Sequence, residues 1–198
     1  MEAPVLTEEF RIEIDPHEVL RMMGVPKRGG GRFKNAPPKA LGLLEELEEH
    51  ALSLVEPKSI YVLCKAEEVS YHEVFRKAGR LAFAVCTIGP RLENESLRFA
   101  ESGSSLRALI LDAMGSAAVE CVVEETAEKI KARARSLRLK GGVRFSPGYG
   151  KWPLTEQRSL FAIADGSVIG VGLNPSCIME PRKSVSFAMR IGENPDAR

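Results

Sequence analysis

The sequence lacks any apolar run long enough to cross a membrane, and its acidic N-terminus has no signal-peptide core. It also lacks an excess of charge, because 28 Lys and Arg residues are balanced by 27 Asp and Glu residues, for a formal net charge of +1. A chain without a large charge of one sign has no overall attraction to nucleic acid or to a membrane surface. We therefore expect a cytoplasmic protein that binds neither nucleic acid nor membrane.

Closely spaced metal ligands are missing as well. The three histidines are isolated, and the four cysteines form no Cys-x-x-Cys: His17, His50, His72, Cys64, Cys86, Cys121 and Cys177. Structural metal sites usually take His and Cys ligands at short, regular spacing. We therefore expect no metal site. Three of the four cysteines lie in apolar segments, which favours buried free thiols over disulfides.

The rest of the composition is typical of a soluble globular protein, with 44% hydrophobic and 28% charged residues. The 198 residues are enough for one good core or two small lobes. Strand and helix patterns alternate without a clean βαβ rhythm, which indicates an α+β fold. We expect a mixed, largely antiparallel sheet packed against helices, one of them long and central.

Hydrophobic periodicity and capping residues predict the individual elements. Strands are expected over 10–14, 59–63, 81–88, 167–173 and 184–191, and helices over 16–23, 39–55, 70–78, 104–139 and 155–161. The last two strands are expected to form an antiparallel pair. Residues 25–38 form a basic loop, which we interpret as a linker rather than as a contact for an acidic partner.

The most unusual stretch is 140–153, where four glycines and two prolines surround an arginine, a tyrosine and the single tryptophan. Such a composition predicts a shaped loop rather than a regular helix or strand. The guanidinium of Arg144 suits a carboxylate or phosphate, and Tyr149 and Trp152 offer flat apolar faces. Two interpretations remain open: a binding loop for a small anionic or zwitterionic ligand with a ring, or a structural corner with an aromatic packed beneath it. Neither glycine-rich nucleotide-binding pattern is present.

The helix expected over 104–139 carries a polar stripe with residues four apart, so that they stack on one side: Asp112, Ser116, Glu120 and Glu124. A stripe of this kind is normally only the solvated edge of a helix. Here it adjoins Gly115, Ala117 and Ala118, whose small side chains would let another group approach closely.

These residues carry a resemblance. The pattern Arg144-x-x-Pro147-Gly148-Tyr149 resembles the S-adenosylmethionine-binding segment of the activation (reactivation) domain of cobalamin-dependent methionine synthase. The wider stretch 144–157, ending at Gln157, looks more like free-standing relatives of that domain. Further landmarks follow the expected order from about 81 to 187, at 87–89, 111–120 and 181–186. The likeness implies one domain over 1–198, with residues 1–38 only weakly matched.

The resemblance implies a function in methionine biosynthesis. In that enzyme the cobalamin occasionally oxidises to an inactive form, and the activation domain presents S-adenosylmethionine while a one-electron donor, such as a flavodoxin or ferredoxin, reduces it. Methyl transfer then restores methylcobalamin. The chain would be a free-standing activation subunit for a methionine synthase or another corrinoid protein that holds the cobalamin. It would be an accessory subunit of a cobalamin-dependent methyltransferase, without catalytic residues of its own.

The resemblance also assigns roles by position. Arg144 would pair with the methionyl carboxylate of the ligand, and Ser146 stands where the family uses backbone groups against the adenosyl part. Tyr149, which follows Gly148 of the same motif, would lie where ligand and corrin meet. Glu120 matches a helical acid near the ligand, with Asp112 and Ser116 as weaker candidates on the same stripe.

Two other hypotheses stay in competition. The chain could be a self-contained S-adenosylmethionine-dependent methyltransferase, although the sequence shows no constellation of general base and nucleophile and no glycine-rich strand-to-helix turn. It could also be an interaction module that keeps the fold without the ligand. Ligand binding and turnover without a corrinoid protein separate the three.

Overall fold

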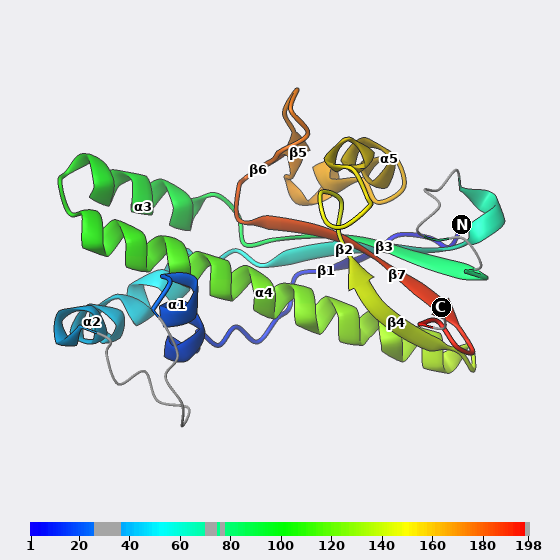
Figure 1. The fold of residues 1–198 in the computed structure, drawn as a ribbon, viewed down its shortest axis with the longest axis horizontal. Coiled ribbons are helices and arrows are strands. Elements are labelled where there is room, and N and C mark those ends of the chain that lie inside the picture. Colours follow the sequence, from blue (N-terminus) through cyan, green and yellow to red (C-terminus); the bar gives the residue numbers. More distant parts are fainter. Residues whose placement is uncertain (26–36, 70–74, 76–77, 197–198) are drawn as a thin grey trace.

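The computed structural model describes residues 1–25, 37–69, 75 and 78–196 (Figure 1). Its main sheet has five strands in the order β1-β2-β3-β7-β4, and every neighbouring pair is antiparallel. The strands are β1 (Val5–Thr7), β2 (Lys58–Lys65), β3 (Arg80–Thr87), β4 (Lys140–Phe145) and β7 (Ser184–Gly192). The predicted α+β class with a largely antiparallel sheet is confirmed.

Helices cover one face of this sheet. The long α4 (Ser105–Ser136) runs along the face, and its apolar side packs together with residues of α1 (Pro16–Met22), α2 (Pro38–Leu54) and α3 (Arg91–Glu101) (Figure 1). The opposite face carries α5 (Gln157–Phe161), a small hairpin of β5 (Gly172–Leu173) and β6 (Met179–Glu180), and the 3₁₀ turns Leu154–Glu156 and Gly166–Ile169. The expected long central helix is confirmed.

The alternation of side-chain size along β3 explains why the long helix lies on this face. Small side chains point toward α4, namely Ala82, Ala84 and Cys86. The larger Leu81, Phe83 and Val85 point into the other half of the core. Successive side chains of a strand face opposite sides, so one strand can present a shallow surface to a helix and a bulky surface to loops.

Several predicted elements match closely. β2, β3 and β7 contain the strands expected over 59–63, 81–88 and 184–191. The first helix begins after Asp15, whose carboxylate accepts a hydrogen bond from the His17 backbone N–H at 2.8 Å. Most of the helix expected over 70–78 and most of the basic loop over 25–38 lie outside the described residues.

The strand predicted over 10–14 is wrong. Phe10, Ile12 and Ile14 alternate as expected, but they pack against the helix-side core without strand pairing. The edge position beside β2 belongs to β1 instead. Alternation reports only that one side of a segment is buried, and a helix surface can bury it as well as a sheet does.

The expected strand over 167–173 is also wrong for most of its length. Asp165 caps a 3₁₀ turn, accepting a hydrogen bond from the Ser167 backbone N–H, and Gly170 ends that turn with φ of 78°. Only Gly172–Leu173 are extended, and they pair with β6 rather than β7. β7 pairs instead with β3 and β4, so the predicted antiparallel pairing of the last two strands is wrong.

Among the described elements that were not predicted, α3 and β4 are the longest. Helix α3 is rich in charge, and only widely spaced apolar residues such as Leu92 and Phe99 mark its buried side. Residues 140–145, which the composition assigned to a loop, form the edge strand β4, with an irregular register between Gly141 and Arg144. The loop prediction holds from Ser146 onward.

Candidate functional site

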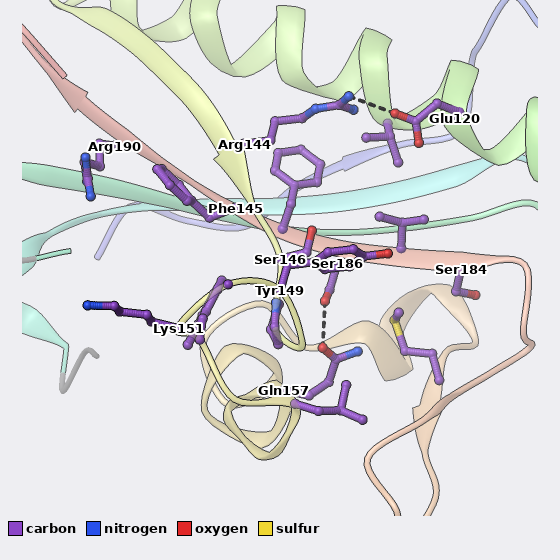
Figure 2. Close-up of a pocket in the computed structure, with 18 residues that line it drawn as sticks. Glu120, Arg144, Phe145, Ser146, Tyr149, Lys151, Gln157, Ser184, Ser186 and Arg190 are labelled. Atoms are coloured by element: carbon purple, nitrogen blue, oxygen red, sulfur yellow. Dashed lines mark hydrogen bonds and ion pairs between the residues drawn. The ribbon is translucent and has the colours of Figure 1, made fainter. Parts of the chain in front are cut away.

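A cavity of about 960 Å³ opens where β4 separates from β7 (Figure 2). β7 pairs with β3 along 184–191, but with β4 only from Ala188 onward. Within the described part of the chain, residues 184–187 therefore have no strand partner on their β4 side, and all four line the cavity. An edge of this kind leaves alternate backbone N–H and C=O groups available to another molecule.

Each wall of the cavity comes from a different element. α4 contributes Glu120 and Val123, the end of β4 and the following loop contribute 144–154, and α5, β6 and β7 complete the enclosure. The lining residues are Glu120, Val123, Arg144, Phe145, Ser146, Pro147, Tyr149, Gly150, Lys151, Trp152, Leu154, Gln157, Met179, Ser184, Val185, Ser186, Phe187 and Arg190. Apolar walls with a few polar groups are typical of small-molecule sites.

Arg144 and Glu120 form an ion pair at this cavity, with the Arg144 Nη2 2.8 Å from the Glu120 Oε1 (Figure 2). The two residues are 24 positions apart and come together because β4 leads back along α4. About a third of each side chain is exposed, 33% for Arg144 and 38% for Glu120. A molecule that carries both a carboxylate and an ammonium group can pair with both partners.

The loop after β4 is anchored by its tryptophan. Trp152 is buried and packs edge-on against Phe75, with ring centroids 4.9 Å apart. The backbone N–H of Gly148 donates to the Trp152 carbonyl at 2.8 Å, and Gly148 has φ of 90°, a conformation that favours glycine. Trp152 is therefore packed beneath the loop, as the structural-corner interpretation expects, although it also lines the cavity. Tyr149 lines the cavity as well and is 77% exposed.

The structure brings together only some of the residues singled out in the sequence. Arg144, Ser146, Tyr149 and Glu120 line one cavity, and Gly148 shapes the loop beside it. Asp112 and Ser116 are not among the lining residues; both bind the ammonium group of Lys183, at 2.8 Å each. Four-residue spacing placed the stripe on one side of α4. The helix is long, however, and its N-terminal part, which carries Asp112 and Ser116, lies beyond the cavity.

Sequence reasoning assigned no role to Gln157, Ser184 or Ser186, which also line the cavity. The hydroxyl of Ser186 donates to the Oε1 of Gln157 at 3.0 Å, and both side chains are buried at 2% exposure. The sequence did contain a signal for these residues. One side of β7 is polar, whereas the neighbouring β3 is apolar on both sides. A polar row on a central strand indicates a site or a buried network.

The described cysteines and histidines do not form a second site. Cys64, Cys86 and Cys177 are buried free thiols, as expected, and Cys121 is partly buried. Burial raises the pKa of the Cys86 thiol to about 12, so this group stays protonated near neutral pH. Among the described residues, no group of three or more His, Cys, Asp or Glu side chains could hold a metal ion. No helix in the same residues is long and apolar enough to span a membrane.

Comparison with known proteins identifies the fold. The structure resembles the crystal structure of the MetH reactivation domain bound to AdoHcy, with a TM-score of 0.71 over 99% of this chain and 80% of that domain. The sequence identity is 14%, so the likeness establishes a shared fold. No protein-family model matches the sequence, and the curated proteins include no significant match.

Proposed function

We propose that this chain is a free-standing activation subunit that binds S-adenosylmethionine and presents it for reductive remethylation of cobalamin. The cobalamin would be held by a methionine synthase or a related corrinoid protein, and a flavodoxin or ferredoxin would supply the electron. The observation that carries the proposal is the Arg144–Glu120 pair at a cavity of about 960 Å³. The shared fold with a domain bound to AdoHcy supports the same ligand class.

The residues at the cavity fit the methionyl part of this ligand. The guanidinium of Arg144 would bind the α-carboxylate, and Glu120 would bind the ammonium group. The ion pair between Arg144 and Glu120 would then give way to two ion pairs with the ligand. Glu120 is the only carboxylate among the described lining residues, and its charge also favours a sulfonium cation. Asp112 and Ser116, which bind Lys183, have no ligand role in this proposal.

The other half of the cavity fits a nucleoside. Residues 184–187 of β7 offer an unpaired strand edge, and Ser146 lies beside it on the loop. Tyr149 stands exposed at the cavity and would meet the corrin of the partner protein. Bound S-adenosylmethionine supplies a methyl group on a positively charged sulfur, and the residues of this chain orient that group toward the partner.

Calorimetric titration with S-adenosylmethionine and S-adenosylhomocysteine tests the proposal. Arg144→Ala and Glu120→Gln should weaken binding, and loss of the Arg144 contact should cost about 2–5 kcal/mol, as for other charge pairs in desolvated sites. Arg135→Ala is the matched control, because this exposed arginine lies on α4 away from the cavity residues. The Arg144–Glu120 pair is partly exposed, so its loss should change the free energy of unfolding by only about 0–1 kcal/mol.

A second measurement concerns the partner. A purified corrinoid protein with a reductant and S-adenosylmethionine should regain its methylated absorption spectrum only when the wild-type chain is present. Failure of the well-folded wild type to bind either nucleoside ligand, even with the corrinoid protein, would contradict the proposal and favour an interaction module. Methyl transfer to another substrate without any corrinoid protein would favour a self-contained methyltransferase.

A further inference from the structure

We propose that Gln157 is a specificity-determining residue that donates a hydrogen bond to one ring nitrogen of a purine in the cavity. The inference rests on the proposed function, because it concerns the nucleoside half of the same ligand. It assigns a role to a side chain that the resemblance includes at the end of a matching stretch but to which it gives no role.

The Gln157 carboxamide is held by a buried hydrogen bond to Ser186, in which its oxygen is the acceptor. The hydroxyl of Ser186 donates to its Oε1 at 3.0 Å, so the amide nitrogen Nε2 is turned away from Ser186 (Figure 2). Both side chains are 2% exposed. The amide nitrogen carries two N–H donors, and no described residue accepts a hydrogen bond from it. Gln157 lines the cavity, so this nitrogen is a contact point for a ligand acceptor.

The surroundings of Gln157 in the cavity indicate which kind of ligand group accepts its hydrogen bond. Figure 2 shows Gln157 at the end away from the Arg144–Glu120 pair, next to Ser186 of β7. The apolar side chains of Leu154 and Met179 line the same cavity. A flat, neutral heterocycle fits such surroundings, since its faces pack against apolar side chains while its ring nitrogens accept hydrogen bonds.

A carboxylate or phosphate does not fit this end of the cavity as well, because a neutral amide compensates a desolvated charge poorly. A pyrimidine could make the single hydrogen bond but would fill less of the space. The purine of the proposed ligand places ring nitrogens on several edges, and the Gln157 donor can meet only one of them. The inference therefore predicts an atom-specific effect.

The test combines variants with ligand analogues that lack single ring nitrogens. Binding of S-adenosylhomocysteine and of its 1-deaza, 3-deaza and 7-deaza analogues is measured by calorimetry for wild type, Gln157→Leu, Gln157→Glu and Ser186→Ala. For the wild type, one of the three analogues should bind about tenfold more weakly than the parent compound, the loss expected for one hydrogen bond. Gln157→Leu should weaken the parent compound by about the same factor and should not weaken that one analogue further.

The other variants separate the donor from its support. Gln157→Glu keeps the shape, but its carboxylate has no N–H donor and repels the lone pair of a ring nitrogen, so it should weaken the parent compound at least as much as Gln157→Leu does. Ser186→Ala removes the hydrogen bond that holds the carboxamide, so the carboxamide can rotate. As expected for a positioning residue, this variant should weaken binding of the parent compound less than Gln157→Leu does, and its selectivity should concern the same ring nitrogen. Thermal unfolding of each variant controls for folding, and Gln157→Glu replaces Gln157→Leu in the comparison if the latter fails to fold.

Two outcomes overturn the inference while the proposed function stands. The first is wild-type affinity of both Gln157 variants for the parent compound when Arg144→Ala has lost its binding. The second is that Gln157→Leu weakens binding of the parent compound and of all three analogues by the same factor, which would show that Gln157 only packs against the ligand. Failure of the wild type to bind any of the four compounds would overturn the proposed function and the inference together.

Discussion

The ion pair of Lys183 and Asp112 joins a nearly buried ammonium group to an exposed carboxylate. The Lys183 Nζ lies 2.8 Å from the Asp112 Oδ1 and 2.8 Å from the Ser116 hydroxyl. The Lys183 side chain is 12% exposed, whereas that of Asp112 is 54% exposed. Removing one partner leaves the other charge behind, so the loss of stability depends on which charge is left and how much water it can reach.

The structure predicts unequal effects for the two substitutions. Asp112→Ala leaves the ammonium of Lys183 with only the Ser116 hydroxyl, and an uncompensated buried charge costs about 3–5 kcal/mol. Partial exposure of Lys183 lowers this value, so we expect a loss of about 2–3 kcal/mol in the free energy of unfolding. Lys183→Met keeps the apolar stem and leaves a solvated carboxylate, so the expected loss is about 1 kcal/mol or less.

Urea unfolding followed by circular dichroism measures these losses, with the double variant included. The double variant should resemble Lys183→Met alone, because removing the ammonium also removes the penalty for leaving it unpaired. Glu67→Ala is the matched control, since its ion pair with Lys65 is exposed on both sides and should contribute little. A larger loss for Lys183→Met than for Asp112→Ala, or strict additivity in the double variant, would refute the reasoning.

Two further predictions concern backbone conformation and a buried thiol. Gly89 has φ of 73°, and an added Cβ would lie 2.8 Å from the Glu56 Oε2, so Gly89→Ala should destabilise the fold by about 1–2 kcal/mol in urea unfolding, whereas Gly172→Ala, with no atom within 4 Å, should be near neutral. Burial raises the pKa of the Cys86 thiol from 9.0 to about 12, so a thiol reagent at pH 8 should leave Cys86 unmodified until urea is added. The raised pKa also means that the contribution of Cys86 to stability is complete below about pH 9 and is lost as the pH rises toward 12, because the unfolded thiol ionises first. A pH–stability curve that is unchanged in Cys86→Ala would contradict this assignment.

Elements with strong local signals could be predicted from the sequence. The continuous apolar run at 81–88 became β3, and the alternation at 184–191 became β7. The capping residue Asp15 marked the start of α1 correctly. Predictions failed where two structures bury the same pattern equally well, as at 10–14, and where charged residues hide a narrow apolar side, as in α3. In the first case, the structure that the segment adopts depends on its neighbours in the fold and not on its own sequence.

The candidate site also has parts that the sequence indicated and parts that it did not. Glycines, prolines and aromatics at 146–153 indicated a shaped loop, and the arginine before it indicated an anion-binding group. The stripe on α4 contained Glu120, which lines the cavity, but it also contained Asp112, which pairs with Lys183. The sequence alone could not rank the members of the stripe, because spacing reports which residues share a side of a helix and not what faces each turn.

The sequence by itself determined the class of the fold, the long central helix, the buried strands and the shaped loop, because these depend on periodicity, capping and backbone freedom within a few residues. Only the tertiary structure decided that β4 leaves β7 at Ala188 and opens a cavity along 184–187. It alone joined Arg144 to Glu120 and Gln157 to Ser186. Contacts between residues this far apart depend on strand order and on how each helix lies across the sheet, which the whole packed core determines.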